Sequence, residues 1–357
     1  MKLPIIINEA GKLYIEAVPQ LAWGKGKECT FIGALEAALA VTTTPHTYEN
    51  LMGWSALAFR TRWFRGDTGR RWCPSGPVGE SPEELELLRQ ATGWALPTTC
   101  NLVSNPTDSP AAVAAAIAQE IRAGRPLLAY EPQLNVGVVF GFEDEGRTLL
   151  LRDYMSDDPV NRLPLDKLGA FLCLLGRRSE GTPPHEAMLA GLNRGVANWH
   201  RSHEPAATGR YWYGRAALLK WRDDLVHAEA FASDQRKLLF FVNWWAFDAL
   251  ADARAAAERF LRRNSEYFLG RQHRHLLQAA DLFGEEARLL RRTLAERKAF
   301  LGPWTGKSTE HWSNAVRERE VGVLNHVLAL ETEAFGELEN MLAATAAPLP
   351  AMETSPV

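Results

Sequence analysis

The sequence predicts an α+β N-terminal half followed by an all-α C-terminal half. Two observations support this prediction. Apolar runs with the length or alternation of β-strands occur only in the first half, whereas apolar residues of the second half recur with helical period. Residues 178–184 (RSEGTPP) lie between the halves and contain the glycine and prolines typical of a linker. We therefore expect one domain over residues 1–178, a second over 183–346, and a disordered tail over 347–357.

The first half combines a cysteine-bearing helix with further helices and with strands. Pro19 ends the first strand, and Phe31 and Leu35 fall on one face of the helix that follows. Ser81-Pro82 and Ser109-Pro110 are good helix starts, because serine caps a helix and proline fits its first turn. The elements expected here are strand 12–18, helix 29–41, helix 48–53, strand 54–64, helix 82–93, helix 110–124 and strands 126–130, 135–142, 147–153 and 170–175.

Loops separate these elements at glycines and prolines. Residues 65–82 contain four glycines and three prolines, a density that no regular element tolerates. Residues 143–146 (EDEG) form the turn of a hairpin, which predicts antiparallel pairing of its two strands. In the second half, Gly302-Pro303 breaks the chain between the last two helices. The helices expected there cover residues 184–203, 210–227, 233–264, 266–281, 285–301 and 308–344.

The composition is that of a globular protein, with 46% hydrophobic and 23% charged residues. A net charge of −3 argues against a nucleic-acid partner, because no basic excess is present to neutralise phosphates. No apolar run is long enough for a signal peptide or a membrane span, so we expect a cytoplasmic protein without a membrane partner.

The four cysteines, at positions 29, 73, 100 and 173, are too dispersed for a zinc or disulfide framework. No nucleotide or metalloprotease motif occurs, and neither a cofactor nor a metal is expected.

Cys29 is the first candidate for chemistry. A loop with Gly24 and Gly26 delivers it to the first turn of a predicted helix. The free amides and the dipole of a helix N-terminus stabilise a thiolate, which is the nucleophilic form of cysteine. The alternative is that Cys29 is a small buried apolar residue, the commonest fate of a free cysteine.

Four segments carry a resemblance to a known family: residues 29–35 (CTFIGAL), 48–60 (YENLMGWSALAFR), 124–129 (GRPLLA) and 139–144 (VFGFED). They resemble the double-glycine leader peptidase group of papain-like cysteine peptidases, and most closely the N-terminal domain of butirosin biosynthesis protein H. The resemblance covers about residues 10–176 and implies a papain-like fold with an antiparallel sheet. Residues 214–225 (GRAALLKWRDDL) resemble the helical domain that often follows this module.

The resemblance implies that Cys29 is the nucleophile, but it also reveals a missing partner. Active members carry a histidine six residues before the glycine that corresponds to Gly141, and this sequence has Asn135 there. Asp153 matches the residue that orients this histidine. Because a neutral amide can neither accept the thiol proton nor protonate a leaving group, the resemblance favours a retained fold with altered or lost catalysis.

Other side chains could complete or replace this site. His46, or a buried Glu131 or Glu143, could act as the base, and Gln20 could donate to an oxyanion. Histidine pairs 200/203 and 273/275 lack a third metal ligand, so a surface or capping role is expected. We expect a cleft beside Cys29 with Asn135 and Asp153 opposite, and with substrate-binding walls formed by Trp54, Phe59 and Arg60.

Three functions fit these observations. The leading hypothesis is a peptidase-like protein that binds a small molecule or peptide with weak or no hydrolysis. The second is an active thiol acyltransferase or amidase that uses Cys29 and an unrecognised base. The third is a helical partner-binding or assembly protein in which the first domain is a scaffold. The sequence leaves the oligomeric state open.

Overall fold

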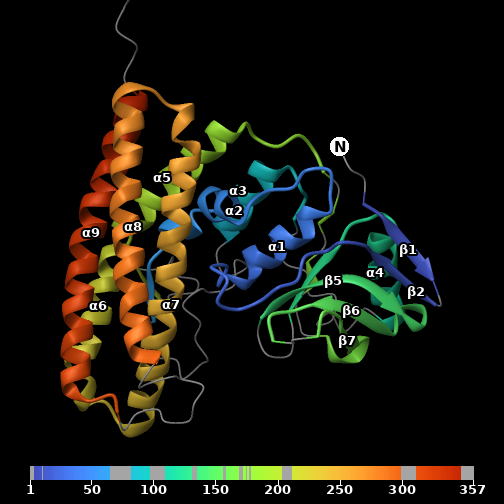
Figure 1. The fold of residues 1–357 in the computed structure, drawn as a ribbon, viewed down its shortest axis with the longest axis horizontal. Helices are drawn as coiled ribbons and strands as arrows, with labels where there is room; N and C mark the ends of the chain where they lie inside the picture. Colours follow the sequence, from blue (N-terminus) through green and yellow to red (C-terminus); the bar gives the residue numbers. More distant parts are fainter. Residues whose placement is uncertain are drawn as a thin grey trace, which may run out of the picture.

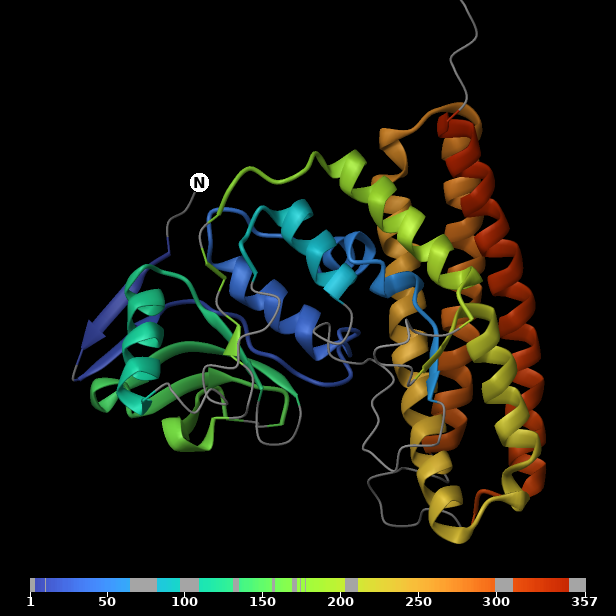
Figure 2. The same cartoon turned by 180° about the vertical axis from the view of Figure 1, so that it is seen from behind.

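The computed structural model combines an antiparallel sheet with long helices, as the sequence predicts at this level (Figure 1). The sheet lies at one end, the helices around Cys29 lie in the middle, and the helices of the second half stand at the other end (Figures 1 and 2). The residues that the structure describes are 4–9, 11–64, 82–96, 109–130, 135–155, 158–168, 172–173, 175–176, 178–202, 211–298 and 311–346. The predicted tail 347–357 lies outside these ranges.

The main sheet is antiparallel throughout and has β5 near its centre. Seven consecutive residues of β5 are buried, which requires that both faces of this strand are covered, because side chains alternate between faces. Helices α1 and α4 both contact β5. The strands are β1 (Ile6–Glu9), β2 (Lys12–Ile15), β4 (Leu127–Tyr130), β5 (Val136–Glu143), β6 (Thr148–Arg152), β7 (Asn161–Pro164) and β8 (Leu172–Cys173).

The helices of the first half lie beside the sheet. They are α1 (Thr30–Ala40), α2 (Tyr48–Trp54), α3 (Pro82–Thr92) and α4 (Pro110–Arg122). The strand expected over residues 54–64 is wrong for most of its length. The structure has the end of α2, a left-handed Ala56 at φ 65°, a 3-10 turn at Leu57–Phe59, and only then the strand β3 (Arg62–Phe64). Tertiary packing overrides the strand propensity of the aromatic residues here.

The second half is helical, with one further strand. Its elements are α5 (Pro184–His200), β9 (Tyr211–Tyr213), α6 (Gly214–Val226), α7 (Ser233–Asn264), α8 (Gly270–Lys298) and α9 (Asn314–Ala346). The two helices expected over 266–281 and 285–301 are a single helix, α8. Gly284 lies inside it and does not end the helix; the atoms nearest to a Cβ at this position belong to the flexible Glu258 carboxyl group on α7.

The two predicted domains are joined by extensive contacts. Strand β3 of the first half pairs with β9 of the second in a separate two-stranded sheet, and α2 packs against α7. The segment predicted as a linker is itself fixed, because the Ser179 amide donates to the Gly93 carbonyl at 2.7 Å and the Thr182 amide donates to the Gln90 carbonyl at 2.8 Å. The chain therefore forms continuous contacts across the predicted boundary.

A buried ion cluster also crosses this boundary. Arg254 of α7, Glu286 of α8 and Glu331 of α9 are all fully buried. The Arg254 Nε atom donates to Glu331 at 2.9 Å and lies 3.4 Å from Glu286, while its Nη1 atom donates to the Ala58 carbonyl at 2.7 Å. The guanidinium group thus joins three helices of the second half to the backbone of the first.

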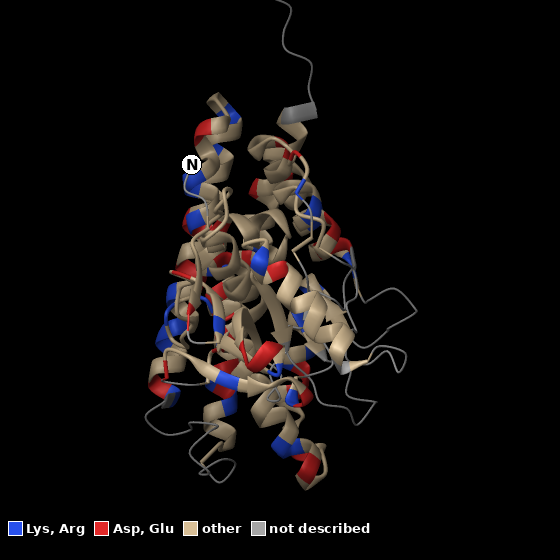
Figure 3. Ribbon diagram, turned by 90° about the vertical axis from the view of Figure 1, so that its right-hand side faces the viewer, with Lys and Arg blue, Asp and Glu red and all other residues tan. Residues whose placement is uncertain are grey.

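Charged residues of both signs are interspersed along the helices in the view of Figure 3. Many of them form ion pairs within or between helices, such as Lys220–Asp224 at 2.8 Å and Arg259–Glu49 at 2.9 Å. No helix among the described residues has the length and apolar character needed to cross a bilayer.

Replacement of Gly191 by alanine is expected to lower the free energy of unfolding by roughly 1–3 kcal/mol, because the new methyl group overpacks the crossing of α5 and α2. A Cβ atom there would lie 2.3 Å from the Gly53 carbonyl oxygen. Gly322→Ala in α9 is the matched control, because nothing lies within 4 Å of that position. It should raise stability by about 0.5–1 kcal/mol through helix propensity. Urea unfolding measures both variants. Equal changes in the free energy of unfolding for Gly191→Ala and Gly322→Ala would contradict the close crossing of α5 and α2.

Candidate functional site

Cys29 lies where the sequence places it, at the N-terminal end of α1. It occupies the N-cap position with φ −78° and ψ 94°, and Gly24 and Gly26 precede it with φ near 72°. Only 8% of the residue is exposed. The side chain makes no cap hydrogen bond, so the helix holds Cys29 by its backbone rather than through its thiol.

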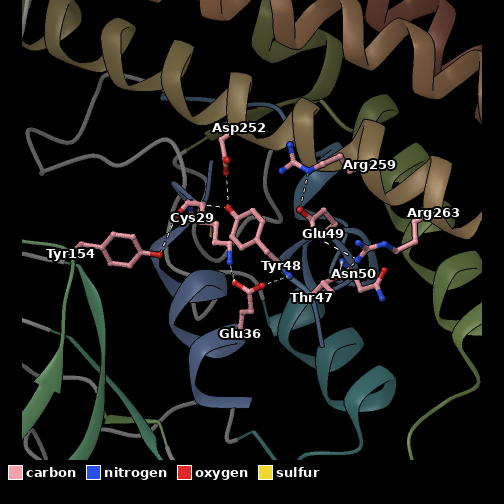
Figure 4. A network of polar contacts seen from close by, with 11 residues as sticks. Cys29, Glu36, Thr47, Tyr48, Glu49, Asn50, Tyr154, Asp252, Arg259 and Arg263 are labelled. Atoms are coloured by element: carbon pink, nitrogen blue, oxygen red, sulfur yellow. Dashed lines mark hydrogen bonds and ion pairs between the residues drawn. The ribbon is translucent and has the colours of Figure 1, made fainter. Parts of the chain in front are cut away.

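A buried tyrosine connects Cys29 to the second half of the chain (Figure 4). The Cys29 amide donates to the Tyr48 hydroxyl oxygen at 3.0 Å, and this hydroxyl donates to Asp252 Oδ2 of α7 at 2.6 Å. The Tyr48 amide donates to Glu36 of α1 at 3.1 Å. Tyr48 thus fixes the starts of α1 and α2 against one position of α7.

Three further contacts hold α2 against the following turns of α7, and Figure 4 shows those made by Arg259 and Arg263. Arg259 Nε donates to Glu49 at 2.9 Å, and Arg263 Nη1 donates to the Thr47 hydroxyl at 2.9 Å. Asn264 Nδ2 donates to Asn50 Oδ1 at 3.1 Å. On the side of Cys29, the two halves therefore contact each other through polar side chains, and each of these side chains has a defined hydrogen-bond partner on the other half.

A small cavity lies next to Cys29 between the two halves. Its volume is about 40 Å³. Since one water requires about 10–15 Å³ by this measure, the cavity has room for about three waters. The lining comes from both halves and includes Cys29, Met52, Arg60, Trp221, Leu250 and Asp252. Such a volume admits a single polar group.

The thiol of Cys29 is protonated at neutral pH, which favours the second of the two alternatives from the sequence, a small buried residue, over a helix-stabilised thiolate. Burial raises the pKa of Cys29 to about 12, and the carboxylates of Asp252 and Glu84 act in the same direction. The nearby Ile32 amide and Arg60 lower the pKa, but desolvation outweighs both. The helix N-terminus alone is insufficient to activate a thiol that is removed from water.

Acidic groups surround the Asp252 side of the cavity. Burial raises the pKa of Asp252 to about 6, with Asp248 adding to the shift, while Tyr48 and Arg259 oppose it. Burial, with Asp248 and Asp252, raises the pKa of Glu28 to about 7. The Oδ1 atom of Asp252 has no hydrogen-bond partner among the described residues, although the Glu28 amide is near enough to lower the pKa of the carboxyl group.

The start of β5 contacts the start of α1 one residue beyond Asn135 and Cys29, and Asp153 makes contacts elsewhere. The Val136 amide donates to the Thr30 hydroxyl at 3.3 Å, and Asn135 and Cys29 are the residues directly before this pair. Asp153 is buried, and it accepts from the Met155 amide at 2.8 Å and from Asn161 Nδ2 at 2.6 Å. The Asp153 carboxylate therefore has Asn161 as a hydrogen-bond partner.

Of the three predicted wall residues, Arg60 lines the cavity. Its Nη1 atom donates to both Glu84 carboxylate oxygens at 2.7 Å. Trp54 and Phe59 are core residues instead, because Trp54 packs edge-on against His46 and Phe59 packs against Phe260 and Phe283.

The candidate bases lie away from Cys29 or in other interactions. His46 is half-buried beside Trp54, and its partial burial lowers its pKa. Glu143 forms ion pairs with Lys12 and Arg162, Gln20 is exposed, and Glu131 lies outside the described residues. His200 contacts Glu339, while His273 contacts the Ser265 carbonyl and His275 contacts Glu337. The described ranges contain no group of three metal-ligating side chains.

Three residues of the site were missed in the sequence: Glu28, Tyr48 and Asp252. One signal for Asp252 was available, because it is an acid enclosed by Leu250, Ala251 and Ala253 in a strongly apolar part of a helix. A carboxylate on such a face must find a buried donor. No comparable local signal distinguishes Tyr48 or Glu28, which contribute through contacts that only the fold creates.

Glu28→Gln is expected to reduce the loss of stability as pH rises from about 4.5 to about 7. The folded-state pKa of Glu28 is raised from 4.5 to about 7, so in this range the folded chain retains a proton that the unfolded chain has lost. The free energy of unfolding therefore falls as pH rises, and glutamine removes this contribution while it can still accept from the Gly24 amide. Urea unfolding at pH 5 and pH 8 measures the effect. The exposed Glu266→Gln should follow the wild-type profile, and an unchanged profile in Glu28→Gln would contradict the raised pKa.

No protein-family model matches this chain, and no curated protein matches it.

Proposed function

We propose that this chain is a small-molecule-binding protein with a papain-like arrangement around Cys29, in which thiol hydrolysis has been lost. Asn135 carries this proposal: it occupies the position where the resemblance requires a histidine, directly before Val136, whose amide donates to the Thr30 hydroxyl at the start of α1. The Asp153 carboxylate, which would orient that histidine, accepts a hydrogen bond from Asn161. The proton transfer that a cysteine acyl-enzyme mechanism needs has no imidazole at this position.

The state of the thiol supports the same proposal. The groups that shift the pKa of Cys29 are the Ile32 amide, Arg60, Asp252 and Glu84, and the dominant effect is burial. The result is a neutral thiol beside a cavity that admits one polar group. This arrangement is suited to contact with a bound ligand and unsuited to nucleophilic attack.

A comparison of the full-length wild type with Cys29→Ala tests this proposal. Both proteins are incubated with model thioesters and amides, product release is followed, and intact mass spectrometry detects acyl adducts. We expect neither adducts nor turnover that depends on Cys29. Small molecules that remain bound after purification should be the same in both proteins. Turnover that disappears in Cys29→Ala would instead establish a thiol acyltransferase or amidase.

A further inference from the structure

Asp252 presents a buried acceptor atom to the cavity beside Cys29. The residue is 4% exposed, lines the cavity, and uses its Oδ2 atom to accept from Tyr48 at 2.6 Å. Its Oδ1 atom has no hydrogen-bond partner in the part of the chain that the structure describes. A carboxylate oxygen removed from water is unfavourable unless a donor reaches it, so the atom is suited to a donor from a ligand.

The charges around Asp252 favour a cationic donor. Glu28 and Asp248 lie near enough to raise the pKa of a neighbouring carboxyl group. Arg259 of α7, which lowers the pKa of Asp252, is paired with Glu49 at 2.9 Å. Two arginines also line the cavity: Arg60 is paired with Glu84 at 2.7 Å, and the Arg62 guanidinium lies over the Tyr211 ring at 3.8 Å. The Asp252 side therefore has an excess of carboxylates, which a positive ligand would relieve and a negative ligand would increase.

The size of the cavity restricts the bound group. About 40 Å³ accommodates one compact head group in place of about three waters. A primary ammonium group is compact and carries three donors, one of which can satisfy Asp252 Oδ1 while the others replace contacts to water. A charge-assisted hydrogen bond of this kind is stronger than one between neutral groups.

We propose that the cavity beside Cys29 binds the primary ammonium group of a small organic cation through Asp252 Oδ1. This inference rests on the proposed binding function and adds the chemical class of the ligand. It assigns the recognition residue to the helical half, so that the ligand is held between the two halves of the chain.

Isothermal titration calorimetry with three matched probes tests the inference. The probes are n-butylammonium, neutral 1-butanol and anionic butyrate, each titrated into the full-length protein at the same ionic strength. Only n-butylammonium should bind. Asp252→Asn should weaken its binding at least tenfold, whereas Asp234→Asn, which removes an exposed carboxylate from the same helix, should leave it unchanged.

Two further variants keep the test decisive if Asp252→Asn does not fold. Asp248→Asn removes a carboxylate that raises the pKa of Asp252 but leaves Asp252 itself in place, so n-butylammonium binding should weaken severalfold. Glu28→Gln removes one nearby charge and should weaken binding severalfold. Binding of 1-butanol or butyrate in place of the cation, or no binding of n-butylammonium, overturns the inference. Turnover that depends on Cys29 overturns the proposed function and is measured separately.

Discussion

Arg254→Met is expected to lower the free energy of unfolding by about 3–5 kcal/mol, the effect of removing one partner from a buried ion pair. Arg254, Glu286 and Glu331 are fully buried in the interior of the helical half. Without the guanidinium group, Glu331 loses its cation, and the Ala58 carbonyl loses its donor. A domain with ordinary stability of about 5–15 kcal/mol would lose a large share of it.

Two controls separate this effect from a general sensitivity of the helices. Arg288→Met removes a largely exposed arginine of α8 and should change stability by less than about 0.5 kcal/mol. Burial and the Glu331 carboxylate raise the pKa of Glu286 well above its usual range, which favours the neutral carboxyl group, so Glu286→Gln disturbs the charges of the cluster far less than Arg254→Met does. Urea unfolding should therefore give an effect of under about 1 kcal/mol for Glu286→Gln. Similar losses for Arg254→Met and Arg288→Met would contradict the buried cluster.

Alkylation of Cys29 by iodoacetamide at pH 7.5 is expected to be about a thousandfold slower in the folded chain than in the unfolded chain. The pKa of Cys29 is about 12 in the fold, whereas an unperturbed thiol titrates near 8.5, so the reactive thiolate fraction falls by roughly three powers of ten. Peptide mass mapping follows Cys29 separately from the other three cysteines.

The same chain in guanidinium chloride is the matched control, because it exposes Cys29 without changing the sequence. In the folded protein the rate should continue to rise about tenfold per pH unit beyond pH 9, where the unfolded thiol levels off. A rate that reaches its plateau near pH 7 would show an activated thiolate, and the acyltransferase hypothesis would then be favoured.

Much of the secondary structure follows from local patterns. The helix over 233–264 was predicted with the bounds of α7, and the hairpin strands of β5 and β6 were predicted to within two residues. The errors arise where tertiary contacts decide the outcome. Residues 54–64 are rich in aromatics, yet most of them form helix and turn because Phe59 packs against the helices of the second half.

The candidate site was predictable only in its sequence-local part. The position of Cys29 at a helix start and the presence of Arg60 beside it follow from nearby residues. Asp252 is 204 residues from its hydrogen-bond partner Tyr48, and no periodicity encodes such a contact. The protonation state of the thiol could not be predicted either, because it depends on how completely the second half covers Cys29.

The pairing of β3 with β9 has a consequence for synthesis of the chain on the ribosome. Translation proceeds from the N-terminus, so Arg62–Phe64 emerges long before its partner strand Tyr211–Tyr213, and Asp252 emerges later still. Contacts between such distant residues form late, since they require closure of a long loop. Until α7 has been synthesised, the nascent chain has an unpaired strand and an incomplete cavity, and this interval is when assistance from a chaperone would matter most.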